Sequence, residues 1–303
     1  MSRIAVVGLG RMGGPMAAHL RAAGHGLTVC DLDDAAVRAC VEAGDAAART
    51  PARAAAEADV VITMLPSAAA VEEATLGAHG VLAGAHAGSV LLEMSTGPPA
   101  LARRLAQAGE GAGIDVLDAP VSGGPPGAIA GTLAIMVGGS ASVLERVRPL
   151  LELMGSVILH MGPPGAGQAT KLCNNLLAGV HMAAIAESVA LARREGLDPA
   201  ALLEVMRNGT GDSRVLRMRY PVPGVLPDAP ASRGFAPLFP VDLIAKDLAL
   251  ALGAAGDHGI EAPVARAALD RYEAAQAEGL GPLDYSAVFA LLEPGVLDEA
   301  GGA

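Results

Sequence analysis

Short apolar runs rich in valine, isoleucine and leucine alternate with alanine-rich stretches over the first half of the chain. The runs cover residues 4–7, 27–30, 60–65, 90–94, 114–118, 133–137 and 157–159. Strands that are buried on both faces give continuous apolar runs of this kind, and their alternation with helices indicates βαβ units. The pattern therefore predicts a mainly parallel sheet, with ligands bound outside the carboxyl ends of its strands.

The second half of the chain has the pattern of helices. Residues 166–194 follow Gly162-Pro163-Pro164-Gly165 without a further proline, and they predict one helix of about 42 Å at 1.5 Å per residue. Further helical patterns cover 198–207, 242–258, 263–278 and 285–292, and a proline-rich passage covers 221–240. We therefore predict two domains, an α/β domain over 1–163 and a helical domain over 164–303, joined by the long helix.

Composition and charge narrow the function classes. The chain of 303 residues has 52% apolar and 17% charged residues, which predicts a compact globular protein. Its formal net charge of −11 repels phosphate backbones and acidic lipid surfaces, so we expect neither nucleic acid nor a membrane as a partner. Cys30, Cys40 and Cys173 fit no disulfide or metal-ligand spacing, and we expect them to be small buried residues. With no signal-peptide pattern, these features predict a cytoplasmic protein without a bound metal.

A glycine-rich motif, Gly8-Leu9-Gly10-Arg11-Met12-Gly13, directly follows the first apolar run and opens a helical stretch. In this context the first glycine allows a tight turn, the second allows a pyrophosphate to approach the backbone, and the third allows the helix to pack on the strand. Asp31 ends the second apolar run, where an acid can bind the ribose hydroxyls of adenosine. An ordinary strand-to-helix turn is the alternative. Because the acids of Asp31-Leu32-Asp33-Asp34 would repel a 2′-phosphate, the combination predicts NAD rather than NADP.

Two further clusters carry candidate chemistry. Lys171 breaks a small and apolar surface in the first turns of the long helix, and Asn174 and Asn175 share its face. Lysine is rarely buried unless it is paired, so Lys171 is either a solvated side chain or a positioned acid, and Lys246-Asp247 presents the same alternatives. Ser122-Gly123-Gly124 follows the fifth apolar run. Its hydroxyl and backbone N–H groups could hold a carboxylate, although turn glycines are common.

Four blocks of the sequence resemble the β-hydroxyacid dehydrogenases, the 3-hydroxyisobutyrate dehydrogenase family. They are Gly8 to Met16, Asp118 to Gly124, Gly167 to Asn175 and Lys246-Asp247-Leu248, and they occur in the family's order across nearly the whole chain. Residues 221–233 and 284–289 look most like the 3-hydroxyisobutyrate branch of the family, and less like the tartronate semialdehyde reductases.

The resemblance implies a Rossmann domain that binds NAD, followed by an all-α domain, with a substrate cleft between them. It implies Lys171 as the catalytic residue and Asn175 as the residue that orients it or the substrate. The substrate would be held by Ser122, Gly123, Gly124, Asn174 and Arg214. Besides the glycine motif and Asp31, the cofactor would be approached by Met64, Leu65, Pro66, Thr96 and Lys246. The family's usual assemblies imply a homodimer or a homotetramer.

The expected reaction is the NAD-dependent oxidation of 3-hydroxyisobutyrate to methylmalonate semialdehyde, a step of valine breakdown. One departure from the family's pattern bears on the substrate, because Arg214 stands where these enzymes typically have tryptophan, and Asp242 departs in the same direction. Reduction of tartronate semialdehyde, or oxidation of another small β-hydroxy acid, is therefore the alternative. A dinucleotide-binding protein without catalytic activity is a further alternative, since a fold does not determine a function.

Overall fold

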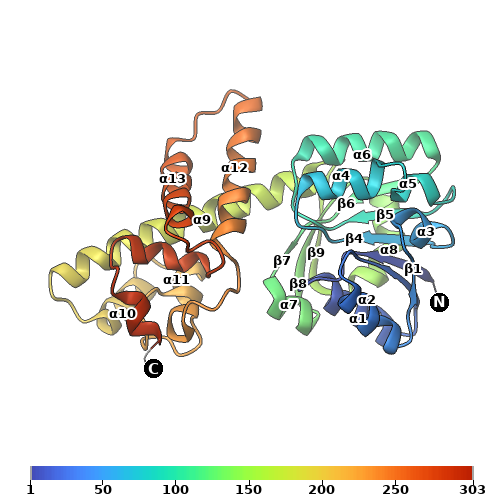
Figure 1. Ribbon diagram of the computed structural model, residues 1–303. Helices are drawn as coiled ribbons and strands as arrows, with labels where there is room; N and C mark the ends of the chain where they lie inside the picture. Colours follow the sequence, from blue (N-terminus) through green and yellow to red (C-terminus); the bar gives the residue numbers. More distant parts are fainter. Residues whose placement is uncertain (1, 302–303) are drawn as a thin grey trace. The chain divides into compact units, whose positions relative to one another are not determined.

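The computed structural model describes residues 2–301, and the chain divides into two compact units, Met1–Lys171 and Leu172–Ala303 (Figure 1). This division lies inside the long helix, whereas the boundary expected from the sequence, between residues 163 and 164, lies just before that helix. Each unit has its own apolar core. The first unit is an α/β sandwich, and the second is helical, as the hydrophobic pattern predicts.

The first unit contains a nine-stranded sheet in the order β3-β2-β1-β4-β5-β6-β8-β7, with β9 paired to β8. The strands are β1 Arg3–Val7, β2 Gly26–Cys30, β3 Ala46–Ala47, β4 Val60–Thr63, β5 Val90–Glu93, β6 Asp115–Asp118, β7 Val121–Ser122, β8 Leu133–Gly138 and β9 Gly155–Gly162. The order from β3 to β6 is that of doubly wound dinucleotide-binding folds, whose topological switch lies between β1 and β4. All pairs up to β6 are parallel, which confirms the mainly parallel sheet.

Two elements of this sheet were not predicted from the sequence. The strands β3 and β7 have two residues each, too few to give an apolar run. In addition, β8 runs antiparallel to both β6 and β7. Because β7 continues past the end of β6 along β8, it carries Ser122 beyond the carboxyl edge of the parallel strands.

Helices cover both faces of the sheet. They are α1 Gly13–Ala22, α2 Asp34–Glu42, α3 Pro51–Ala55, α4 Ala68–Leu76, α5 Val81–Gly84, α6 Pro99–Ala112, α7 Gly124–Ala130 and α8 Ala141–Leu151. Figure 1 shows α4, α5 and α6 on one face and α1 and α2 on the other. Along β1, Ile4 and Val6 belong to the core beneath α1, while Ala5 and Val7 belong to the opposite core. The strand is therefore buried on both faces, which explains its continuous apolar run.

The second unit is formed by most of the long helix, α9 Ala166–Arg194, and the elements that follow it. These are α10 Pro199–Asn208, α11 Arg214–Arg219, the 3₁₀ helix η1 Pro230–Arg233, α12 Val241–Asp257, α13 Pro263–Ala277, the 3₁₀ helix η2 Tyr285–Leu291 and α14 Val296–Gly301. The helical pattern expected at 285–292 forms a 3₁₀ helix, and not an α-helix, over Tyr285–Leu291. Its residues from Tyr285 to Ala290 are all buried, and the side chain of Asp284 accepts a hydrogen bond from the Ser286 N–H group (3.1 Å).

By length and composition alone, α9 could cross a membrane, since an 18-residue window of it has a mean hydropathy of 1.4. This is weak evidence, because a core helix of a globular protein meets the same criterion. The side chains of Met182 and Val189 on α9 are fully buried in the core of the second unit. The apolar composition of α9 therefore has an explanation in packing.

Candidate functional site

The turn between β1 and α1 has the geometry that a bound pyrophosphate requires. Gly8 has a φ of +97°, and a Cβ atom at this position would lie 2.2 Å from the carbonyl oxygen of Met64. A Cβ atom at Gly13 would lie 1.9 Å from the carbonyl oxygen of Gly8, so no larger residue fits there without a backbone shift. Gly10 has no atom within 4 Å of the position of its Cβ and faces open space. The turn therefore fits NAD, with Gly10 at the place of closest approach.

The start of α1 supports the same fit. Within the described residues, no side chain caps this helix. Its Gly14 N–H group donates to the carbonyl oxygen of Gly10 (3.0 Å), so an anion at this end of the helix would meet the N–H groups that precede Gly14. Asp31, at the end of β2, accepts hydrogen bonds from the N–H groups of Leu9 (2.5 Å) and Asp33 (2.8 Å). The carboxylate therefore lies directly beside the glycine turn. Each carboxylate oxygen can accept a second bond, which leaves capacity for a ribose hydroxyl.

Two buried acids lie at the carboxyl ends of the neighbouring strands. Glu93 ends β5 and Asp118 ends β6, and both are almost completely buried. Burial raises the pKa of Glu93 to about 7, against the opposing effect of its hydrogen bonds from Ser95 and Gln168. Burial also raises the pKa of Asp118, although the N–H groups of Gly165 and Gln168 donate to its carboxylate. Neither acid was assigned to the site from the sequence.

The raised pKa of Glu93 predicts a pH dependence of stability. Because the folded protein holds this proton more tightly than the unfolded chain, whose glutamate pKa is near 4.5, the stabilisation is complete below pH 4.5 and is lost as the pH rises towards 7. Between these pH values, the unfolding free energy of the wild type should fall by roughly 3 kcal/mol relative to that of Glu93→Gln. Urea unfolding of both proteins at pH 4.5 and pH 7 measures this change. An equal difference at the two pH values would contradict it.

The predicted carboxylate-binding turn follows β7. Gly123 has a φ of +136° and Gly124 a φ of +61°, which are conformations that glycine adopts without strain. Pro125 and Pro126 follow in α7 and carry no backbone N–H group. The donors in this turn are therefore the N–H groups of the two glycines and the hydroxyl of Ser122, which is half-buried.

Lys171 lies in the second turn of α9, and its side chain is buried, with 7% exposed. The solvated alternative for this lysine is therefore excluded. The start of α9 packs directly on the sheet, because a Cβ atom at Gly167 would lie 2.3 Å from the carbonyl oxygen of Met136 on β8. Lys171 and Lys246 are the only lysines in the chain, and the remaining basic residues, apart from histidine, are arginines. Lysine differs from arginine in that it can release a proton at accessible pH.

The second unit brings together a different group of predicted residues. Asn175 on α9 is buried, and its amide donates to Asp247 Oδ2 on α12 (2.6 Å). The amide of Asn174 donates to Asn175 Oδ1 (3.0 Å), and Lys246 Nζ lies 3.2 Å from Asp247 Oδ1. Asp247 is 1% exposed and contacts both Asn175 and Lys246. It was not assigned to the site from the sequence. The sequence did contain a signal for this residue, because an aspartate stands on the otherwise apolar face of α12. Asp247 shares that face with Ile244 and other core residues.

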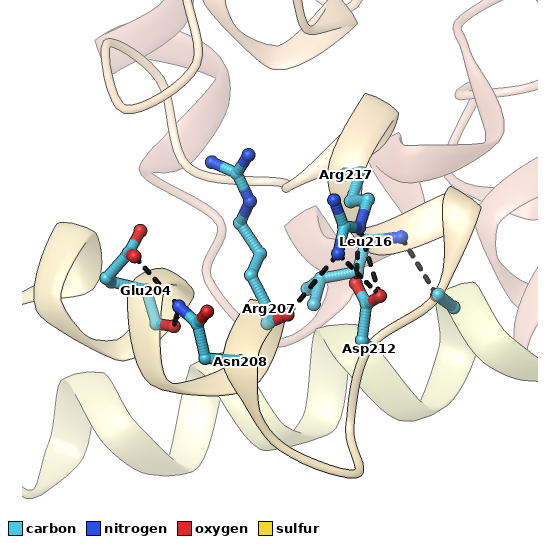
Figure 2. Close-up of polar contacts among 7 residues, drawn as sticks. Glu204, Arg207, Asn208, Asp212, Leu216 and Arg217 are labelled. Carbon is cyan, nitrogen blue, oxygen red and sulfur yellow. Dashed lines mark hydrogen bonds and ion pairs between the residues drawn. The ribbon is translucent and has the colours of Figure 1, made fainter.

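Arg214 lies outside the network of Asn175. It begins α11, where its exposed guanidinium donates to the sulfur of Met218 (3.4 Å). Figure 2 shows the connection between α10 and α11. There Asp212 forms an ion pair with Arg217 on α11 (2.7 Å), and Arg217 donates to the carbonyl oxygen of Arg207 (3.4 Å). The hydrogen bonds from Arg217 lower the pKa of Asp212. The turn is therefore held by its own contacts, and the role of Arg214 towards a substrate stays a prediction.

The predicted site residues thus fall into two sets. The first unit holds Gly8 to Gly13, Asp31, Met64 to Pro66, Thr96, Ser122 to Gly124 and Lys171, and the second holds Asn174, Asn175, Arg214 and Lys246. Over residues 2–301, no group of three or more histidine, cysteine, aspartate or glutamate side chains is placed to hold a metal ion. Cys30 and Cys40 are buried as expected, but Cys173 is exposed on α9, so that expectation is wrong for Cys173.

Comparison with known proteins places these features in context. Residues 3–162 match the model of the NAD binding domain of 6-phosphogluconate dehydrogenase. Residues 165–292 match the model described as NAD-binding of NADP-dependent 3-hydroxyisobutyrate dehydrogenase. The NAD-dependent L-serine dehydrogenase of Pseudomonas aeruginosa is 46% identical over 294 residues, which cover 97% of this chain and 99% of that protein.

Two further similar proteins are named 3-hydroxyisobutyrate dehydrogenase. The 3-hydroxyisobutyrate dehydrogenase of Pseudomonas aeruginosa is 46% identical over 293 residues, which cover 95% of this chain and 97% of that protein. The solved structure of Mycobacterium tuberculosis 3-hydroxyisobutyrate dehydrogenase with L-serine is similar with a TM-score of 0.91 and 43% identity. The match covers 96% of this chain and 99% of the solved one.

Proposed function

The chain belongs to the 3-hydroxyisobutyrate dehydrogenase family of NAD-dependent β-hydroxyacid dehydrogenases, and from this premise we propose that it oxidises 3-hydroxyisobutyrate to methylmalonate semialdehyde. The observation that carries the proposal is the buried Lys171 at the start of α9. This lysine belongs to the same compact unit as the glycine turn and Ser122. In this role the enzyme would serve valine breakdown, and we propose that it acts as a homodimer or a homotetramer.

The residues of the chain divide the work of the reaction. When bound, NAD supplies the hydride acceptor. Lys171 Nζ accepts the proton of the β-hydroxyl group as the alcohol becomes an aldehyde, and it returns that proton in the reverse direction. Lys171 is therefore a neutral amine before this step, and the ammonium group that the proton transfer forms stabilises negative charge that develops on the oxygen. Ser122 and the N–H groups of Gly123 and Gly124 hold the substrate carboxylate, and Asn175 orients the reacting groups under the control of Asp247.

L-serine is the second candidate substrate. It shares the carboxylate and the β-hydroxyl of 3-hydroxyisobutyrate, and it carries an ammonium group where the other substrate has a methyl group. One relative at 46% identity is named for the oxidation of L-serine, and the similar solved structure holds L-serine. The positive charge of Arg214 would oppose the ammonium group if it lined the site, and it would favour the more oxidised, polar substrate tartronate semialdehyde.

A substrate panel with both nicotinamide cofactors tests the proposal. We expect NAD reduction with 3-hydroxyisobutyrate at the highest kcat/KM, with L-serine lower and with NADP at least tenfold lower. The panel includes NADH oxidation by tartronate semialdehyde, and Lys171→Met serves as the matched inactive control. A higher kcat/KM for L-serine or for tartronate semialdehyde would replace the proposed substrate. No turnover with any β-hydroxy acid would favour a dinucleotide-binding protein without catalytic activity.

The cofactor preference gives a separate prediction for Asp31. Asp31→Asn keeps an acceptor for the Leu9 N–H group but loses the negative charge that binds ribose hydroxyls and repels a 2′-phosphate. A hydrogen bond to a charged group contributes about 1.5 to 3 kcal/mol, so the preference for NAD over NADP should fall roughly 10- to 100-fold. The ratio of kcat/KM for the two cofactors measures this change. Asp34→Asn, which removes an equal charge three residues later, is the control, and an equal change in both variants would contradict the assignment.

A further inference from the structure

The side chain of Gln168, in the first turn of α9, is completely enclosed and completely hydrogen-bonded. It is 1% exposed. Its Nε2 atom donates to Glu93 Oε2 (2.9 Å) and to the carbonyl oxygen of Ser95 (2.8 Å). Its Oε1 atom accepts from the N–H group of Gly97 (2.9 Å). A single side chain on α9 therefore bonds to the last residue of β5 and to the segment that follows this strand, and that segment contains Thr96.

The same network extends to the neighbouring turn and strand. Ser95 donates its N–H group to Glu93 Oε1 (2.8 Å), and its hydroxyl accepts from the N–H group of Leu65 (2.8 Å). On the other side, Asp118 accepts from the N–H groups of Gly165 (2.8 Å) and Gln168 (2.9 Å). The first turn of α9 is thus bonded to the end of β5, to the segment after β5 and to the end of β6, and Ser95 links this network to the turn after β4. These segments carry or precede the residues expected to bind the cofactor and the substrate carboxylate.

Stability alone does not account for this arrangement. Glu93, Ser95, Asp118 and Gln168 are each no more than 3% exposed, and the burial of carboxylates and amides is unfavourable unless every group is paired. Apolar residues of similar volume commonly give equal or greater stability than a buried polar network. The network also fixes geometry, because each hydrogen bond restricts the orientation of both partners. The side chain whose position depends on this geometry is Lys171, one turn further along α9.

We propose that Gln168, held by Glu93, is the positioning residue for Lys171. Lys171 follows Gln168 by three residues, which places it about 4.5 Å further along the axis and on an adjacent part of the same helix face. The Gln168 bonds fix the rotation of this helical turn about its axis, and its position along that axis, relative to the ends of β5 and β6 and the segment after β5. The proposal rests on the proposed function, in which Lys171 Nζ must lie within reach of the β-hydroxyl group.

The test removes the network at each of its two ends and then at both. Gln168→Met keeps the length and volume of the side chain but loses its three hydrogen bonds, and Glu93→Gln replaces an acceptor with a donor. The double variant completes a cycle. Thr170→Val is the matched control, because it removes only a bond within α9, from the hydroxyl to the carbonyl oxygen of Ala166 (2.8 Å). Gln168→Asn, which keeps the amide but shortens its reach, replaces Gln168→Met if that variant does not fold.

Two readouts are measured for each variant in the full-length protein. The first is the steady-state rate, together with the dissociation constant of NAD. The second is the NMR signal of the ε-carbon in protein labelled with [ε-¹³C]lysine, which contains only the signals of Lys171 and Lys246. We expect Gln168→Met to reduce kcat roughly 10- to 100-fold, because displacements near 1 Å have effects of this size. NAD affinity and the substrate KM should change several-fold less than kcat, a split that a general loss of structure would not produce.

The NMR signal is expected to separate positioning from activity. In Gln168→Met and in Glu93→Gln the signal of Lys171 should shift, while that of Lys246 stays in place, and Thr170→Val should move neither. The double variant should lose no more activity than the worse single variant, because the two residues act as a unit. An unchanged Lys171 signal in Gln168→Met, or losses that add in the double variant, would overturn the proposal. If the wild type oxidises no β-hydroxy acid, the proposed function fails, and the NMR signals still decide whether Gln168 positions Lys171.

Discussion

Lys171→Met is expected to slow the oxidation of the preferred β-hydroxy acid by about 10²- to 10⁴-fold and to leave NAD binding unchanged. General acid–base catalysis contributes a factor of this size, and methionine cannot accept a proton or stabilise a negative oxygen. Methionine is close to lysine in length, and the site is almost completely buried, so the variant should keep its fold. The measurements are kcat by NAD reduction and the dissociation constant of NAD by fluorescence.

The second lysine provides the contrast for this result. Lys246→Met should raise the KM for NAD more than it lowers kcat, because Lys246 is expected to approach the cofactor and is paired with Asp247 (3.2 Å). A loss of kcat below tenfold in Lys171→Met would show that another group moves the proton. A loss of NAD affinity equal to the loss of kcat would show that Lys171 holds the cofactor and does not act on the substrate.

Gly13→Ala is expected to abolish NAD binding, with a rise in the dissociation constant of more than about 100-fold. The added methyl group would meet the carbonyl oxygen of Gly8 at 1.9 Å, and backbone atoms cannot rotate away from it. The start of α1 would therefore separate from β1, and the N–H groups that face the pyrophosphate would move apart. Overpacking of this kind typically lowers the unfolding free energy by about 1 to 3 kcal/mol. Calorimetric titration with NAD and urea unfolding measure the two effects.

Gly10→Ala distinguishes the binding effect from the packing effect. The methyl group would meet no atom within 4 Å, so the unfolding free energy should stay within about 1 kcal/mol of the wild type. NAD affinity should still fall, because the pyrophosphate approaches the backbone at this glycine. Gly26→Ala also meets no atom within 4 Å. Gly26 begins β2, whereas Asp31 follows the opposite end of this strand, so NAD affinity should not change in Gly26→Ala. Unchanged affinity in Gly10→Ala would contradict the placement of the pyrophosphate.

Much of the fold was predictable because its signals are local. Seven apolar runs correspond to strands, and 166–194 corresponds to α9 with both ends as expected. The errors lie where tertiary contacts determine the local structure. The segment 285–291 becomes a 3₁₀ helix because its residues are buried on almost every side and Asp284 bonds to Ser286. The two-residue strand β7 forms because β8 offers it an edge, which no pattern within Val121–Ser122 indicates.

The candidate site was predictable only where a motif carries its own geometry. The spacing of Gly8, Gly10 and Gly13 predicts that a Cβ atom would clash with backbone at the first and third glycines and would meet open space at the second. The structure has this arrangement. The buried partners were not predictable, because they are far away in the sequence. Gln168 bonds to Glu93 across 75 residues, and Asn175 bonds to Asp247 across 72. A polar residue alone does not reveal such a partner, since exposed glutamine and aspartate are common on helices.

If Lys171 is the general base, its ionisation controls the oxidation of the substrate. Titration of [ε-¹³C]lysine signals by NMR in the NAD complex measures this ionisation directly, because Lys171→Met removes one of only two signals and so assigns the other. We expect the midpoint of the Lys171 signal to coincide with the ionisation that limits kcat/KM at low pH, measured with the same cofactor. A Lys171 signal that does not titrate across that pH range, or the same inflection in the residual activity of Lys171→Met, would contradict it.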